Sequence, residues 1–237
     1  MHNYIKNEYY TILIMNTRSS AKTKEYDEEI KNINTRINKE ICYEIIDKLN
    51  DVNLMDDYKE CKSVKSNIEY LNSLLEEFGM THEDRNSVIN RYILKLIPAG
   101  TKGVIRGVKF NNIVMNYINN LCIDNKRFII KYEKHHDVKY TSEIPDWYIF
   151  DNFTQKIIIG MNQLDLWKGG QQSNRGYKYI VDFKTDPNVK LLCVVCNEIK
   201  FTNSCNKAYT LFKVGYENNT LCYINNIRGI IFEYFDL

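Results

Sequence analysis

The apolar positions of the N-terminal part of the chain recur every three or four residues, the spacing of an amphipathic helix. The first stripe consists of Ile30, Ile33, Ile37, Ile41, Ile45 and Leu49. A second stripe runs over 68–78 and stops at Gly79. Thr81, with Asp84 three residues later, has the pattern of an N-cap, and the helix that it opens should end before Pro98. This part of the chain is therefore predicted to be helical.

The pattern then changes to strands. After a loop at Ala99–Gly107 we expect a fourth helix, whose apolar residues are Phe110, Val114 and Tyr117. Runs of β-branched and aromatic residues predict strands at 127–134, 146–151, 156–167, 189–197 and 228–235. The polar residues 152–155 indicate a β-hairpin, and 168–184 is compatible with a helix. The order predicts an α/β or α+β fold, with a helical region over 1–97 packed on a core of 98–237 in one continuous globular unit.

Charge is distributed unevenly along the 237 residues, although the formal net charge is only +2. Residues 21–90 hold ten basic and sixteen acidic side chains, whereas 91–138 hold nine basic and three acidic ones. The net charges of the two windows are therefore −6 and +6. Attraction to nucleic acid depends on the local surface, so near-neutrality excludes a polycation but permits one basic cleft.

The cysteine count and the N-terminus bear on the compartment. Seven cysteines without dense, regular spacing do not form the framework of a secreted disulfide-rich domain. Lys6 and Glu8 interrupt the apolar N-terminal residues, which therefore do not resemble a signal peptide. The longest apolar runs are far shorter than the ~20 residues of a membrane span. We expect a cytoplasmic protein in a reducing environment, with no membrane partner.

Two other groups invite a metal-binding interpretation. His135-His136 lies next to Asp137, but no suitably spaced Asn-His partner follows, and a surface turn is the preferred interpretation. Cys193 and Cys196 are separated by two valines within a strand pattern. Buried, reduced thiols are therefore preferred to a zinc site. The tryptophans, Trp147 and Trp167, are expected to pack in the core.

The stretch 143–180 carries the most informative chemistry. Pro145-Asp146 leads into one strand of the expected hairpin, and Met161, Gln163 and Asp165 share one face of the returning strand. Asp146 and the face of Gln163 and Asp165 could then meet at one end of the sheet. Two carboxylates beside polar amides could hold a hard cation such as Mg²⁺.

The residues after this strand are suited to nucleic acid. Amides and guanidinium groups read base edges, and a helix that begins after Gly170 would present a positive N-terminus to phosphate. The candidate DNA-binding residues are Gln171, Gln172, Asn174, Arg175 and Lys178. Arg106 and Lys109, from the basic window, are candidate phosphate contacts.

In this order, Pro145-Asp146, the hairpin spacing and the segment with Arg175 and Lys178 resemble the PD-(D/E)xK nuclease superfamily. Within it they are most similar to type II restriction endonucleases of the EcoRI-like group. The resemblance covers 98–237 and leaves the N-terminal helices unassigned. It implies a central mixed sheet flanked by helices, Mg²⁺-dependent and site-specific hydrolysis of double-stranded DNA, and a homodimer.

The resemblance also implies roles for individual residues. Asp146 and Asp165 would hold Mg²⁺, Lys168 would stabilise developing negative charge, and Gln163 would occupy the position of the family's lysine, which some members replace by glutamine. The second acid is left open among Asp165, Asp151 and Glu143, in that order.

The family's second motif is an acid, any residue and then a lysine on the second strand. This strand offers Met161-Asn162-Gln163 or Gln163-Leu164-Asp165, and neither ends in lysine. Because of this departure, two alternatives remain. The first is a catalytically inactive nuclease-fold protein that binds nucleic acid or a protein partner. The second is an interaction protein built on the acidic N-terminal helices.

Overall fold

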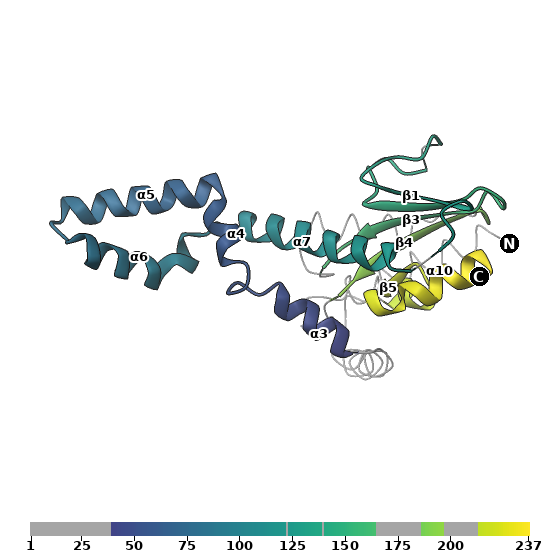
Figure 1. Ribbon diagram of the computed structural model, residues 1–237, viewed down its shortest axis with the longest axis horizontal. Coiled ribbons are helices and arrows are strands. Elements are labelled where there is room, and N and C mark those ends of the chain that lie inside the picture. The colour runs from purple at the N-terminus through teal and green to yellow at the C-terminus, as the bar shows by residue number, and fades with distance from the viewer. Residues whose placement is uncertain (1–38, 122, 139, 165–185, 197–212) are drawn as a thin grey trace, which may run out of the picture. The chain divides into compact units, whose positions relative to one another are not determined.

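The computed structural model describes residues 39–237 except 122, 139, 165–185 and 197–212 (Figure 1). The chain divides into two compact units. The helical unit comprises Glu44–Asn112, and the sheet unit comprises the described residues of Ile113–Leu237 together with those from Lys39 to Tyr43. The boundaries between the two units follow Tyr43 and Asn112, whereas the sequence analysis places a single boundary between residues 97 and 98.

The described helices before the sheet are α3 (Lys39–Lys48), α4 (Met55–Glu60), α5 (Lys62–Glu77), α6 (His82–Leu96) and α7 (Ala99–Asn119). The predicted ends of α5 and α6 are confirmed. Gly79 adopts a φ of 75° after α5, and Met80 N donates to Leu75 O (3.2 Å), which closes the last turn. Thr81 accepts a hydrogen bond from Asp84 N (3.2 Å) at the start of α6.

The predicted loop at Ala99–Gly107 is wrong, because α7 begins at Ala99. Its three glycines lower the helix propensity of this stretch. Tertiary contacts offset that cost, as they commonly do. Lys102 Nζ pairs with Asp51 Oδ2 (2.8 Å), and Ile105 packs against a buried cluster. That cluster consists of Leu54, Tyr58, Val64 and Ile97.

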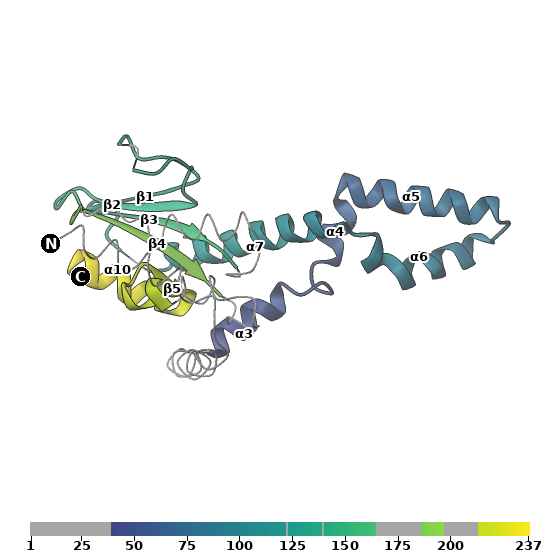
Figure 2. The same ribbon diagram turned by 180° about the vertical axis from the view of Figure 1, so that it is seen from behind.

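The sheet unit contains a five-stranded mixed sheet, so the fold is mixed α/β (Figures 1 and 2). Its strands, in spatial order, are β1 (Phe128–Tyr132), β2 (Trp147–Asp151), β3 (Ile157–Asn162), β4 (Val189–Val195) and β5 (Leu221–Tyr223). β1, β2 and β3 are antiparallel neighbours, whereas β4 and β5 run parallel to β3. The first four strands are confirmed predictions, and the three-residue β5 was missed.

The predicted hairpin between β2 and β3 is confirmed. Asp151 N donates to Lys156 O (2.9 Å), and Gln155 N donates to Asp151 O (2.9 Å). Gln155 takes a left-handed conformation, with a φ of 59°. The side chain of Asp151 also caps the turn, because it accepts hydrogen bonds from Phe153 N and the Thr154 hydroxyl.

The predicted last strand at 228–235 is wrong. After a single 3₁₀ turn, η1 (Ile224–Asn226), this segment forms helix α10 (Ile227–Phe235). Ile227, Ile231 and Phe235 lie four residues apart and are completely buried. This spacing forms one apolar stripe on a helix, and its burial favours a helix over a strand. The Phe235 ring packs on Phe128 of β1, with 5.0 Å between ring centroids.

Strands β2 and β3 are buried along their whole length on both faces. The face that carries Trp147 also carries Tyr132 and Lys190 by register. Tyr132 Oη donates to Met115 O of α7 (3.3 Å), and Lys190 Nζ lies 5.8 Å from the centroid of the Tyr234 ring in α10. Helices α7 and α10 therefore cover this face. Within the described residues, no helix combines the length and the apolar character of a membrane span.

Candidate active site at the end of strand β3

Asp146 stands immediately before β2, after the buried Pro145. Its backbone continues the sheet on both sides, since Glu133 N donates to Asp146 O (3.0 Å) and Asp146 N donates to Gly160 O (3.1 Å). Its half-buried carboxylate accepts a hydrogen bond from Asn162 N to Oδ2 (2.6 Å). A backbone donor at the end of β3 thus fixes one carboxylate oxygen.

Gln163 follows the last residue of β3 and is 8% exposed. Its N donates to Val194 O (2.8 Å), so the parallel ladder with β4 continues through this residue. The register pairs Trp147 with Gly160, which sets Asp146 opposite Met161. Because side chains alternate, Gln163 lies on the face of Met161 and is the diagonal neighbour of Asp146. The structure therefore brings Asp146 and Gln163 to the same end of the sheet.

The location suits ligand binding. β3, β4 and β5 are parallel, so their carboxyl ends lie at one edge of the sheet. β2 is antiparallel to β3, so it begins at that same edge with Asp146. In open α/β sheets, ligands commonly bind beyond the carboxyl ends of parallel strands.

Sequence reasoning missed the role of Asn162. Its side-chain Oδ1 accepts a hydrogen bond from Trp147 Nε1 (2.9 Å), and both side chains are at least nine-tenths buried. Trp147 thus packs in the core, as predicted, and also anchors the residue whose N–H binds Asp146. The signal for this role in the sequence is that Asn162, a polar residue, stands next to Gln163 at the end of a predicted strand.

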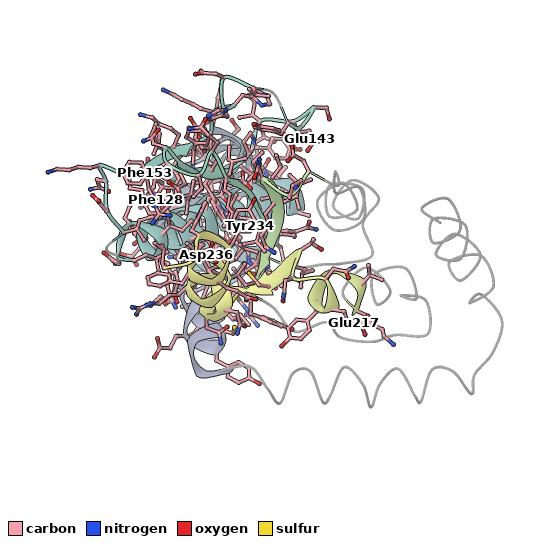
Figure 3. The ribbon with its side chains drawn as sticks, turned by 90° about the vertical axis from the view of Figure 1, so that its right-hand side faces the viewer. Phe128, Glu143, Phe153, Glu217, Tyr234 and Asp236 are labelled. Carbon is pink, nitrogen blue, oxygen red and sulfur yellow. The ribbon has the colours of Figure 1, made fainter. Side chains whose placement is uncertain are left out.

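Asp151 does not belong to this edge, which corrects its place among the alternatives for the second acid. It ends β2 at the hairpin, about 16 Å along the strand from Asp146. There it forms a bidentate ion pair with Arg127, at 3.1 and 2.6 Å. These bonds, opposed by burial, hold the pKa of Asp151 well below its usual range. Figure 3 shows Phe153, in the same turn, far from Glu143 in the loop before β2.

Asp165, the first alternative for the second acid, the proposed charge-stabilising lysine and most of the proposed DNA contacts lie outside the described residues. These are Asp165, Lys168, Gln171, Gln172, Asn174, Arg175 and Lys178. The predicted helix over 168–184 and Trp167 lie outside them as well.

Arg106 and Lys109 lie on α7 within the helical unit. Lys109 Nζ forms an ion pair with Asp57 Oδ1 (2.8 Å), and both side chains are partly exposed. Arg106 is half-buried, and its charge lowers the pKa of the neighbouring Asp51 after the larger effect of Lys102. Both cations therefore interact with acids of their own unit.

His135 and His136 lie in the irregular loop between β1 and β2, and the structure adds the contacts that His136 makes there. His136 is half-buried, its ring centroid is 4.5 Å from that of Phe150, and its Nδ1 accepts a hydrogen bond from Val138 N (3.3 Å). It therefore covers the face of β2 opposite to Trp147. Cys193 and Cys196 are buried and free of disulfides, as predicted.

Asp146 offers a carboxylate oxygen, the donor type that Mg²⁺ takes, and Gln163 adds a neutral amide beside it. Asp146 therefore fits one ligand of a magnesium site, and Asp165, the other expected ligand, lies outside the described residues. Within the described ranges, no group of three or more His, Cys, Asp and Glu side chains is placed to hold a metal ion. No protein-family model, curated protein or solved structure matches this chain.

Proposed function

We propose that the protein is a Mg²⁺-dependent, site-specific endonuclease that hydrolyses phosphodiester bonds of double-stranded DNA. The observation that carries the proposal is the pairing of Asp146 with the end of β3. Its carboxylate is held by Asn162 N and lies diagonally across from Gln163. The type II restriction endonucleases that the sequence resembles would have a metal-binding acid and a lysine at these two positions.

The order of elements gives further support. Helix α7 is followed by the three antiparallel strands β1, β2 and β3, and β4 then runs parallel to β3. A parallel return requires a crossover connection between the two strands. This order agrees with the restriction-endonuclease-like core that the resemblance implies.

In the proposed reaction, Asp146 and Asp165 would hold Mg²⁺, and Gln163 would orient a phosphate oxygen or water without adding charge. The bound ion would supply a more acidic water and would stabilise charge on the phosphate. Lys168 would add a positive charge, and the polar residues within 171–178 would contact bases. A homodimer would match a palindromic duplex by its two-fold symmetry.

The test compares purified wild-type protein with Asp146→Asn on long, sequence-diverse duplex DNA in Mg²⁺. The asparagine keeps an oxygen that accepts the Asn162 N–H but removes the charge that a cation needs. We expect discrete fragments from the wild type, none in the presence of a chelator, and a cleavage rate at least about 10²-fold lower for the variant.

The matched control is Asp137→Asn, which removes one exposed acid from the loop between β1 and β2. It should cleave at the wild-type rate. Equal cleavage by wild type and Asp146→Asn would contradict the proposed role of Asp146.

A nuclease-fold protein that binds without cleaving is the second candidate. The buried Met161 and Gln163, which stand where the family has an acid and a lysine, favour it. Salt-sensitive DNA binding without cleavage in Mg²⁺ or Mn²⁺ would establish this alternative.

A further inference from the structure

The helical unit exposes an apolar stripe on one side of the α5–α6 hairpin. The two helices lie side by side and antiparallel (Figures 1 and 2). Helical spacing puts five apolar residues on this side, which we call the hairpin stripe: Leu71, Leu74, Phe78, Val88 and Tyr92. Phe78 is 77% exposed and Tyr92 is 41% exposed, whereas the other three are half-buried. The opposite side has a groove lined by polar residues that include Glu69, Asn72 and Asn86.

The charges that flank the hairpin stripe are separated along its length. Glu77 and Asp84 lie at the tip, near the turn at Gly79. Arg91 and Lys95 lie at the base, and their cationic groups are 5.8 and 5.2 Å from the centroid of the Tyr92 ring. Among the described residues, none of these four charged side chains takes part in an ion pair.

We propose that a second copy of this chain covers the hairpin stripe, with the two hairpins packed antiparallel as a four-helix bundle. A two-fold axis near the middle of the stripe places the acidic tip of each copy against the basic base of the other. Parallel packing would instead oppose like charges. Four helices close an apolar core that two helices leave open. This inference does not depend on the proposed nuclease function.

The test uses charge exchange in the full chain, measured by sedimentation velocity up to about 100 µM protein. The tip variant, Glu77→Lys/Asp84→Lys, carries positive charge at both ends of the stripe. The base variant, Arg91→Glu/Lys95→Glu, carries negative charge at both ends. We expect a wild-type dimer, at least tenfold weaker self-association of each variant, and a heterodimer when the two variants are mixed.

The matched control is Glu69→Lys/Glu83→Lys, which changes the net charge as the tip variant does but away from the stripe; it should dimerise like the wild type. A wild-type protein that stays monomeric overturns the proposal. So do charge variants that self-associate like the wild type, or that do not associate when mixed.

Circular dichroism checks the helix content of each variant, since Asp84 also accepts a hydrogen bond from the Thr81 hydroxyl. Phe78→Ser gives an independent measurement, because its exposed ring contributes little to the fold of one copy. It should weaken the dimer at least tenfold, and an unchanged dimer contradicts the proposal.

Discussion

The side chain of Asp151 joins three parts of the sheet unit. It is fully buried and accepts hydrogen bonds from Arg127, Phe153 N and the Thr154 hydroxyl. Arg127 Nη2 also donates to Phe235 O (3.2 Å) at the end of α10. The carboxylate therefore links β1, the hairpin turn and the C-terminal helix.

Removal of this carboxylate should destabilise the sheet unit in a pH-dependent way. Asp151→Ala should lower the free energy of unfolding by about 2 kcal/mol at pH 7, because bonds to a charged, buried group are lost. The folded pKa of Asp151 is depressed, so its stabilisation is complete above the unfolded pKa of about 3.9 and disappears as pH falls through the folded pKa. Urea unfolding of the wild type and Asp151→Ala at pH 7 and at pH 3 measures the difference in free energy of unfolding at each pH, and this difference should be smaller at pH 3.

Asp137→Ala, at an exposed acid, is the control for this measurement and should change stability little at either pH. A difference between wild type and Asp151→Ala that grows on acidification would contradict the assigned direction of the pKa shift.

At the site, sequence reasoning found Asp146 and Gln163 because strand alternation and a hairpin place them at one edge. It could not find the contact between Asn162 and Trp147, because that contact depends on the register of two strands. The sequence likewise offered Asp151 as a metal ligand, since an acid at a strand end looks the same whether it binds a cation or a buried arginine.

At the scale of elements, the antiparallel pairing of β2 and β3 includes one position where a large side chain packs directly on a glycine. Trp147 lies opposite Gly160, and a Cβ at position 160 would overlap with the Cε2, Cζ2 and Cδ2 atoms of the indole. The indole cannot move easily, because it is fully buried and its Nε1 is bonded to Asn162. Glycine is therefore required by space at this position.

Gly160→Ala should destabilise the protein by about 2–3 kcal/mol, because overpacking forces the indole or the strand to shift. Gly229→Ala, on an exposed position of α10 where a Cβ meets nothing within 4 Å, should instead stabilise it by about 0.5–1 kcal/mol. Urea unfolding of the two variants provides the comparison, and an unaltered stability of Gly160→Ala would contradict the assigned fit.

The elements that sequence could predict are those whose local pattern and tertiary role agree. β2 and β3 are β-branched and aromatic throughout, and their burial on both faces requires such runs. In α10 the same β-branched and aromatic residue types led to the prediction of a strand, although Ile227, Ile231 and Phe235 have helical spacing. The first turns of α7 were assigned to a loop because tertiary contacts, the pairing of Lys102 with Asp51 and the packing of Ile105, offset the low helix propensity there.

For the whole molecule, the structure divides the basic window over 91–138 between the two units. In the helical unit, Lys102 and Lys109 are paired with acids. In the sheet unit, Lys131 and Lys134 are exposed, and neither has an ion pair among the described residues. Net charge along the sequence therefore overstates the positive surface of the helical unit.

If the protein binds DNA as proposed, Lys131→Ala/Lys134→Ala should reduce the slope of log affinity against log salt by up to about 1.8, at about 0.9 for each phosphate contact. Lys109→Ala should reduce it by less, because Asp57 already balances that charge. Fluorescence anisotropy of a labelled duplex across a salt series measures each slope. A larger loss from Lys109→Ala than from the double variant would reverse this assignment.

The hydrogen bond between Trp147 and Asn162 also provides an optical signal. Asn162 takes part in both hydrogen bonds: its N donates to Asp146, and its Oδ1 accepts from the indole Nε1 of Trp147. An ion that binds the carboxylate of Asp146 should therefore change the polarity around the indole. The chain has two tryptophans, so replacement of Trp167 by phenylalanine would leave one emitter. Occupancy of the strand end could then be followed by intrinsic fluorescence, without a label or a substrate.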